Sequence, residues 1–146
     1  MSIQYPEGLF NIVEEVNIPE MKKLSPGENA VVFIVGKEDI DAGHMDLLSK
    51  IALAIGIDIE KQAILIQLEN NTQYSIMDIL KHHRNTTLII FGHHEDQIKT
   101  QFNKIKYFWL KFGGHQILFA DTLISISENI NLKKELWTQL KSEFDK

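Results

Sequence analysis

The sequence contains no cysteine and only three prolines. Without cysteine there are no disulfides, thiolate metal sites or iron–sulfur clusters, so the fold must rest on packing. No apolar run approaches the roughly 20 residues that span a bilayer. The first residues also lack the basic flank and apolar block of a secretory signal. We therefore expect a cytoplasmic protein that has no membrane partner.

Positive charge is scarce as well. The chain has 15 Lys and Arg residues against 20 Asp and Glu residues, which gives a formal net charge of −5. Tight binding of a phosphate backbone needs a positive field that this balance does not supply. The composition thus argues against a general nucleic-acid binder and leaves only weak or indirect nucleic-acid contact.

Several catalytic signatures are missing too. The sequence has no glycine-rich phosphate loop of a standard type and no serine in a nucleophile elbow. The histidine pairs, His82-His83 and His93-His94, do not match a known zinc spacing, and adjacent histidines point in different directions on a strand or a helix. We expect no metal and no cofactor.

Alternating apolar patterns are what the sequence does contain. Nearly continuous apolar segments at residues 30–35, 63–66, 87–91 and 116–120 are typical of parallel strands covered on both faces. Between them, apolar residues recur at helical spacings of three and four: Met45, Leu48, Ile51, Ala52 and Ile55; Ile76, Ile79 and Leu80; Ile98, Phe102 and Ile105; Leu132, Leu136, Trp137 and Leu140. This alternation predicts a three-layer α/β/α sandwich with a four-stranded central parallel sheet.

Glycines and prolines mark the boundaries of these elements. Gly36 and Gly92 are expected to end two strands, Gly56 to cap a helix, and Gly113-Gly114 to turn into the last strand. Residues 30–146 are predicted to form a single domain. Residues 1–29, which contain all three prolines, are predicted to be an N-terminal arm with a short helix.

Ligands of an open parallel sheet bind beyond the carboxyl ends of its strands. The loops expected there are residues 36–43, 67–73, 92–96 and 121–126. The first carries the acidic residues Glu38, Asp39 and Asp41, one of which could serve as a general base. A solvated acidic loop is the simpler interpretation.

The last predicted strand and helix carry a resemblance to a known family. Residues 116–120 run into Asp121-Thr122-Leu123, and Asn129 and Trp137 follow on the next helix. This order resembles the C-terminal motif of the uracil-DNA glycosylase superfamily, in which a buried strand delivers a His-Pro-Ser loop. Aligned on the Asn and the Trp, Thr122 takes the place of the catalytic His, Leu123 of the Pro and Ile124 of the Ser.

The segment after the first strand is similar to the first motif of the same superfamily. Gly43, and further along Leu47, Leu48, Ile55 and Gly56, match its scaffold. In its catalytic part, Lys37 follows Gly36 at the place of the water-activating acid or amide. Excision of a base needs a group that positions the water and a stabiliser for the departing base. The resemblance therefore implies a glycosylase-like fold with a degenerate active site.

A compact, non-catalytic branch of that fold is the psi-subunit family of bacterial DNA polymerase III, which this chain resembles in size and in its C-terminal Trp137. Psi subunits bind the clamp-loader ATPase through an N-terminal arm and the chi subunit through the folded body. The resemblance thus implies a protein-interaction module linked to replication or repair machinery. The arm of this chain is acidic, with Glu7, Glu14, Glu15 and Glu20.

Two alternatives stay open. The first is an enzyme of the same fold, a base glycosylase or other hydrolase, with a rearranged site that uses converging carboxylates and His93 or His94. The second is a single-strand binder in which Lys106, Tyr107 and Trp109 combine charge with base stacking. The lysine and aromatic segment is explained more simply as an amphipathic helix that runs into a buried strand edge.

Overall fold

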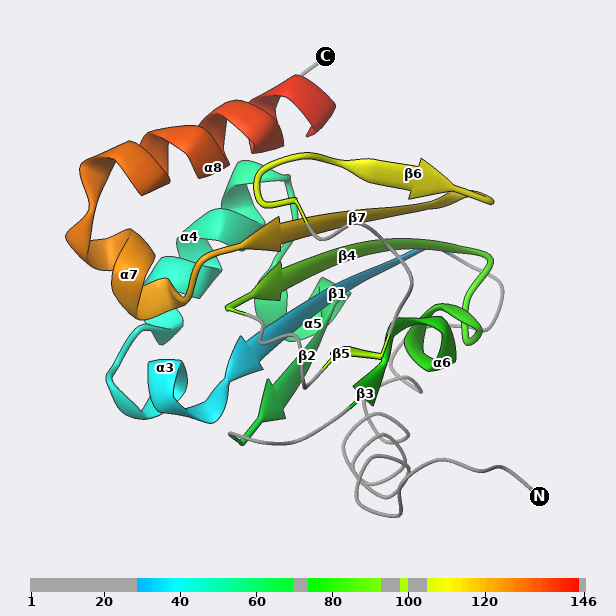
Figure 1. Cartoon of the computed structure of the whole chain (residues 1–146), viewed down its shortest axis with the longest axis horizontal. Coiled ribbons are helices and arrows are strands. Elements are labelled where there is room, and N and C mark those ends of the chain that lie inside the picture. The colour runs from blue at the N-terminus through cyan, green and yellow to red at the C-terminus, as the bar shows by residue number, and fades with distance from the viewer. Residues whose placement is uncertain (1–28, 70–73, 93–97, 100–104, 145–146) are drawn as a thin grey trace.

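The chain folds into an α/β structure with a central sheet (Figure 1). The computed structural model describes residues 29–69, 74–92, 98–99 and 105–144, so most of the predicted arm, together with His93 and His94, lies outside the described residues. The strands are β1 (Asn29–Gly36), β2 (Ala63–Leu68), β3 (Tyr74–Ser75), β4 (Asn85–Phe91), β5 (Ile98–Lys99), β6 (Leu110–Phe112) and β7 (His115–Ala120). The helices are α3 (Lys37–Asp41), α4 (Met45–Ala54), α5 (Ile59–Gln62), α6 (Ile76–Leu80), α7 (Leu123–Glu128) and α8 (Ile130–Phe144).

The main sheet has five strands in the order β2-β1-β4-β7-β6. The four predicted strands are present as β1, β2, β4 and β7, and they pair in parallel. The prediction of a purely parallel four-stranded sheet is wrong, because β6 adds an antiparallel edge to β7. Strand β2 forms the other edge, and its Gln67 is accordingly exposed. β6 escaped prediction because three residues are too few for a periodic pattern.

A tight hairpin joins β6 to β7 through Gly113 and Gly114. Their φ values are 54° and 87°, in the left-handed region that a two-residue hairpin turn requires at both central positions. The space is also tight, because a Cβ on Gly114 would overlap with the side-chain oxygen of Asn85. The turn predicted at Gly113-Gly114 is thus confirmed, with a strand on each side of it.

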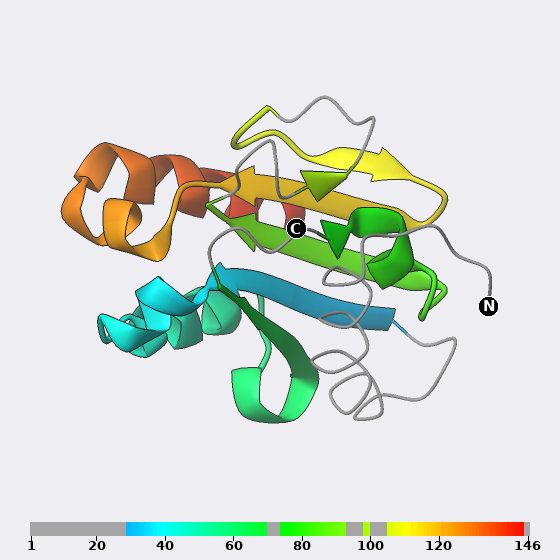
Figure 2. The same cartoon turned by 60° about the horizontal axis from the view of Figure 1, so that its bottom comes forward.

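Alternate residues of the strands form two apolar clusters, one on each face of the sheet. Helices cover both faces (Figure 1 and Figure 2). Helix α6 packs on one face through Ile76, Ile79 and Leu80. Helices α4, α7 and α8 pack on the other face, where Phe33 and Phe91 form a tilted ring pair. Coverage of both faces explains why the strands are nearly continuous in apolar residues rather than alternating.

Helix α4 was predicted from its apolar spacing and is observed with Leu48, Ile51 and Ala52 buried. It ends as expected at Gly56, whose φ is 83°. The Gly56 N–H donates to the Leu53 carbonyl at 2.9 Å and the Ile57 N–H donates to the Ala52 carbonyl at 3.0 Å. This bond pattern is a Schellman motif, which only a residue that tolerates positive φ closes without strain.

Helix α8 confirms the predicted C-terminal helix. Oδ1 of Asn129 accepts hydrogen bonds from the N–H groups of Asn131 and Leu132, at 2.9 and 3.3 Å. Asn129 is therefore the residue that caps the helix.

The predicted helix through Ile98, Phe102 and Ile105 is wrong where the structure describes it. Ile98 and Lys99 form β5, which pairs in parallel with Tyr74 and Ser75 of β3. Ile105 lies outside any helix and is exposed, and Phe102 lies outside the described residues. Three apolar positions at helical spacing are too few to separate a helix from irregular chain.

Within the described ranges, every helix is too short or too polar to cross a membrane.

Candidate functional site

The two loops predicted to carry the degenerate motif meet at one edge of the sheet. β1 and β7 end there, beside α3 and α7, at the left of Figure 1. Gly36 is the last residue of β1 and precedes α3, while Thr122 precedes α7. The topology therefore brings the positions Gly36 and Lys37 to the same edge as Thr122, Leu123 and Ile124.

The residue that ties the two loops together is Asp39. Its side chain is only 2% exposed. Oδ2 of Asp39 accepts the N–H of Leu123 at 2.8 Å, and Oδ1 accepts the N–H of Ile124 at 3.3 Å. Both N–H groups belong to the first turn of α7, where backbone N–H groups have no acceptor within the helix and a nearby carboxylate is stabilising. Asp39 thus fastens α3 to the start of α7, and both of its oxygens are occupied.

Thr122, at the position of the catalytic histidine in the resemblance, caps the same helix. Its Oγ1 accepts the N–H of Ser125 at 3.1 Å and donates to the Ser125 hydroxyl at 3.0 Å. Gly92, just beyond β4, lies directly against it, because a Cβ on Gly92 would overlap with Cγ2 of Thr122. The hydroxyl is therefore committed to the helix start, and its methyl group fills the space beside the neighbouring strand.

The other positions of the predicted degenerate motif differ in their exposure to solvent. Lys37 is exposed, and Gly43 has a φ of 88° in the turn before α4. Leu123 is fully buried in the cluster of α4, α7 and α8, and Ile124 is half-buried. Among these positions only Lys37 carries a charged group, and its side chain is exposed to solvent. Thr122 and Leu123 thus make contacts within the scaffold, whereas Lys37 faces solvent.

The segment with Lys106 and Tyr107 crosses the end of β7 and holds Asp121. Lys106 pairs in a parallel bridge with Phe119, and the Tyr107 N–H donates to the Phe119 carbonyl at 2.8 Å. Lys106 Nζ lies 2.6 Å from Oδ1 of Asp121, and the Tyr107 hydroxyl donates to Oδ2 of Asp121 at 2.8 Å. The residue before Thr122 is thus held by two neighbouring side chains.

Tyr107 has an unusual backbone conformation and a raised pKa. Its φ of 59° lies in the left-handed region that favours glycine. Burial raises the pKa of the phenol well above its ordinary value of 10.0, and the Asp121 carboxylate adds to that effect. The hydroxyl therefore remains a donor at neutral pH, and it accepts the Asp121 N–H at 3.2 Å as well.

Trp109, the third residue predicted for single-strand contact, packs on α8. Its Nε1 donates to the Gln139 carbonyl at 3.1 Å, and its ring meets Phe144 edge-on at a centroid distance of 5.9 Å. The indole is half-buried in this arrangement. The single-strand hypothesis requires Tyr107, Phe108 or Trp109 to face solvent, and Phe108 does so, with 55% of its surface exposed.

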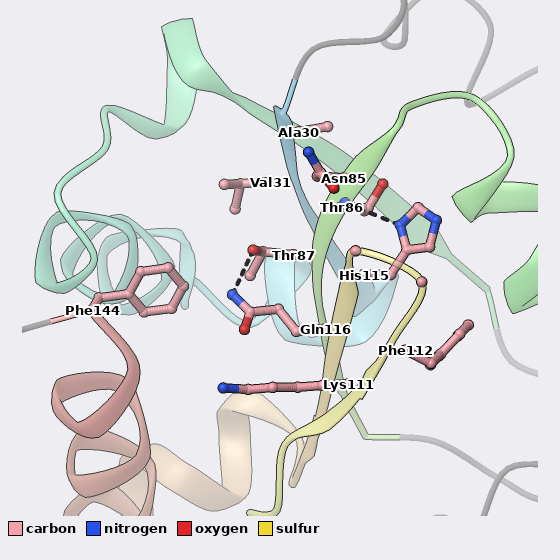
Figure 3. A pocket seen from close by; sticks show the side chains of 12 residues that line it. Ala30, Val31, Asn85, Thr86, Thr87, Lys111, Phe112, His115, Gln116 and Phe144 are labelled. Carbon is pink, nitrogen blue, oxygen red and sulfur yellow. Dashed lines mark hydrogen bonds between the residues drawn. The ribbon is translucent and has the colours of Figure 1, made fainter.

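A pocket of about 680 Å³ opens at the opposite edge, where the parallel strands begin (Figure 3). Thr87, Gln116 and Lys111 lie in register across three strands and point to the same side, toward Phe144. Gln116 Nε2 donates to Thr87 Oγ1 at 3.0 Å, and Lys111 Nζ lies 2.7 Å from a Glu143 oxygen. The remaining lining residues are Ala30, Val31, Asn85, Thr86, Phe112, Gly113, Gly114 and His115.

His115 contributes a fixed ring to this edge. Its Nδ1 accepts the N–H of Thr86 at 3.1 Å, so the neutral ring carries its proton on Nε2. Burial lowers its pKa below the ordinary value of 6.5, which favours the neutral form. No carboxylate is among the described residues that line the pocket. These groups suit hydrogen bonding to a small polar molecule.

The histidines did not converge with acids among the residues that the structure describes. No group of three His, Asp or Glu side chains there could hold a metal ion. His83 is buried, and burial together with the nearby Lys81 lowers the pKa of the half-buried His82. The second pair, His93 and His94, lies outside the described residues.

Sequence reasoning missed the role of Asp39 and the pocket at the edge where the strands begin. Asp39 stood out only as one of three acids in a loop, and nothing local distinguishes it from Glu38. A weak signal for the pocket existed in Thr87 and Gln116, the polar residues that open the predicted apolar segments 87–91 and 116–120.

Comparisons of the chain with protein families, with curated proteins and with solved structures found no match.

Proposed function

We propose that the chain is a non-catalytic protein-interaction module with a glycosylase-like α/β/α sandwich fold. The observation that carries the proposal is the buried Asp39 carboxylate, which accepts two N–H groups at the start of α7. It is the acid that joins the two degenerate loops, and it stabilises the scaffold instead of contacting solvent. A general base must reach the proton that it abstracts, and a carboxylate engaged in this way does not.

The two degenerate loops support the same proposal. Base excision requires a flipped nucleotide in a snug pocket, a positioned water and a stabiliser for the leaving base. Lys37 is exposed to solvent, and the Thr122 hydroxyl is engaged by Ser125. The space beside Thr122 is filled by the close approach of Gly92. The contacts of Thr122 stabilise the fold and occupy a hydroxyl group and a volume that excision would use.

The kind of partner follows from the resemblance to the psi-subunit family. A module of that kind would serve as an accessory subunit of a replication clamp loader, or of related repair machinery. Residues 1–29 would contact one partner and the folded body another. The acidic balance of the chain agrees with contact through proteins rather than directly through DNA.

Affinity capture from cells of the source organism tests this function. The full chain and a variant without residues 1–29 serve as baits, and captured proteins are then purified and titrated against each bait. We expect a defined protein partner that binds the full chain saturably. The proposal fails if purified candidates do not bind either bait and the chain turns over a nucleic-acid substrate.

The second candidate is an enzyme of the same fold with a rearranged site. The observation that favours it is the pocket at the edge where the strands begin, with Gln116, Lys111 and His115. An activity screen of the full chain against base glycosides and small hydrolysable esters tests it, with Gln116→Ala as the variant. Turnover that the substitution abolishes in a folded protein would support this candidate.

A further inference from the structure

A groove of about 350 Å³ runs between α4 and α8 on the outer side of the molecule. Apolar side chains and one lysine line it, and its surface is partly apolar and partly polar. The lining residues are Leu53, Ala54, Ile55, Gly56, Trp137, Lys141 and Phe144. Both helices present their buried faces to the same cluster, so the groove lies on the surface where the two helices flank one another.

The groove carries apolar surface that the fold does not use. Leu53 is 68% exposed, although Leu48, Ile51 and Ala52 of the same helix are buried. On α8, Ile130 is also 68% exposed. It lies seven residues before Trp137, which places both on nearly the same side of the helix. Ile130 lies beyond the residues that line the groove, whereas Leu53 and the half-buried Trp137 both line it. An exposed aliphatic side chain beside a Trp is typical of an interaction site.

Lysines frame this apolar surface. Lys134 and Lys141 lie three residues before and four residues after Trp137, which places them on the same side of α8. Lys50 lies one turn before Leu53 on α4. All three are exposed, and none forms an ion pair within 4.0 Å among the described residues.

The acids of α8 lie elsewhere. Glu143 is engaged by Lys111 of β6, at 2.7 Å. Glu135 is two residues from Trp137, about 200° around the helix, and therefore faces away from the groove. The lysines Lys134 and Lys141 thus have no acid on their side of α8 among the described residues, whereas on α4 the exposed Asp46 lies one turn before Lys50.

We propose that the groove between α4 and α8 docks an acidic, amphipathic segment of a protein partner. Apolar anchors of the segment fill the space beside Leu53 and Trp137, and its carboxylates face Lys50, Lys134 and Lys141. The lining combines the aliphatic side chains of Leu53, Ala54 and Ile55 with the rings of Trp137 and Phe144, which suits a Leu or Phe anchor. The inference rests on the proposed function, since it names the surface and the partner chemistry of an interaction module.

Fluorescence anisotropy of a labelled probe peptide tests the proposal on the full chain. The probe is a short helical peptide with Leu or Phe at positions i, i+3, i+4 and i+7 and Glu at the others. We expect saturable binding that weakens at least about tenfold with Leu53→Glu or with Lys141→Glu. Raising the salt concentration should weaken the binding as well.

Matched controls lie away from the groove. Met77→Glu places the same charge on a residue of α6 that is 52% exposed and packs on the opposite face of the sheet. Lys61→Glu reverses an exposed lysine on α5. Both variants should bind the probe within about twofold of the unmodified chain. Circular dichroism verifies that every variant is folded.

Several outcomes would overturn the proposal: no saturable binding of the probe, equal binding by Leu53→Glu, or equal binding of a peptide with Lys in place of Glu. Sedimentation that shows a dimer lost with Leu53→Glu would assign the groove to a second copy of the chain. Displacement of the probe by a single-stranded oligonucleotide would assign it to nucleic acid. A uracil-release assay on the same preparations distinguishes failure of the docking proposal from failure of the proposed function. Uracil release would refute the non-catalytic function whether or not the probe peptide binds.

Discussion

Asp39 and Leu123 lie 84 residues apart in the chain, and the Leu123 N–H donates a 2.8 Å hydrogen bond to Oδ2 of Asp39. The bond joins the helix after the first strand to the helix after the last one. A second bond from Ile124 engages the other oxygen. The carboxylate thus caps α7 from across the sheet edge, and this is the place where the resemblance has catalytic groups.

Replacing this carboxylate should destabilise the fold. Asp39→Ala leaves two N–H groups without an acceptor, so we expect a loss of about 2 kcal/mol in the free energy of unfolding. Asp39→Asn retains one oxygen acceptor and should lose less. Urea unfolding followed by circular dichroism measures both. The control is Asp41→Ala at an exposed position, which should stay within about 0.5 kcal/mol of the unmodified chain. Equal effects of Asp39→Ala and Asp41→Ala would contradict the capping role.

The approach of Gly92 to Thr122 gives a second prediction. A Cβ at Gly92 would overlap with Cγ2 of Thr122 at a φ of 69°, so Gly92→Ala should cost about 2 kcal/mol. Thr122→Ser removes Cγ2 and keeps the capping hydroxyl, so it should recover roughly half of that loss in the double variant.

Gly36→Ala is the matched control for the second prediction. Gly36 has a φ of −75°, and nothing lies within 4 Å of an added Cβ. Its unfolding free energy should therefore stay within about 0.5 kcal/mol of the original value. If Gly92→Ala lowers the unfolding free energy no more than Gly36→Ala does, Gly92 and Thr122 are not packed against each other as described.

The pH dependence of stability should report on His115. Burial lowers its folded-state pKa below 6.5, so the unfolded chain takes up this proton first. Its contribution to stability is therefore full above pH 6.5 and is lost as the pH falls below that value toward the folded-state pKa. His82, whose pKa burial also lowers, adds to the same trend.

His115→Asn isolates the contribution of His115, because an Asn side chain offers an acceptor for the Thr86 N–H and does not titrate. Unfolding free energies at a series of pH values should fall less steeply for this variant on the acid side. Identical slopes for the two proteins would show that His115 is not held in its neutral form.

A titration with single-stranded DNA should leave Trp109 unaffected. Its indole donates to Gln139 and packs on Phe144, so no base can stack on it without breaking those contacts. Trp137→Phe makes Trp109 the sole emitter, and its fluorescence should stay constant as oligonucleotide is added. Saturable quenching that disappears with the exposed Phe108 changed to Ala would instead favour the single-strand binder.

The strands and long helices could be predicted from the sequence because their burial leaves a strong local pattern. The runs that became β1, β4 and β7 are continuous in apolar residues since helices cover both faces. α4 and α8 repeat apolar residues over three or more turns. In α3, α5 and β6, at most five residues are involved, and so short a stretch sets no period.

The site was harder to predict because its contacts are not local. The sequence could align Thr122 with a position that is catalytic in the family it resembles. It could not show that Asp39 caps the same loop, since that contact depends on how β1 and β7 are placed in the sheet. The packing of Trp109 on Gln139 is hidden for the same reason, because it joins segments 30 residues apart. Tertiary placement decides which polar groups remain available for chemistry.

Uracil release from an oligonucleotide that contains deoxyuridine is the most direct test of the central claim. The full chain is incubated in excess over the substrate, with an active glycosylase as the positive control. We predict no release above the protein-free blank, because both carboxylate oxygens of Asp39 accept N–H groups at the start of α7. Release by the unmodified chain that is abolished in a folded Asp39→Asn or Glu38→Gln variant would contradict the account.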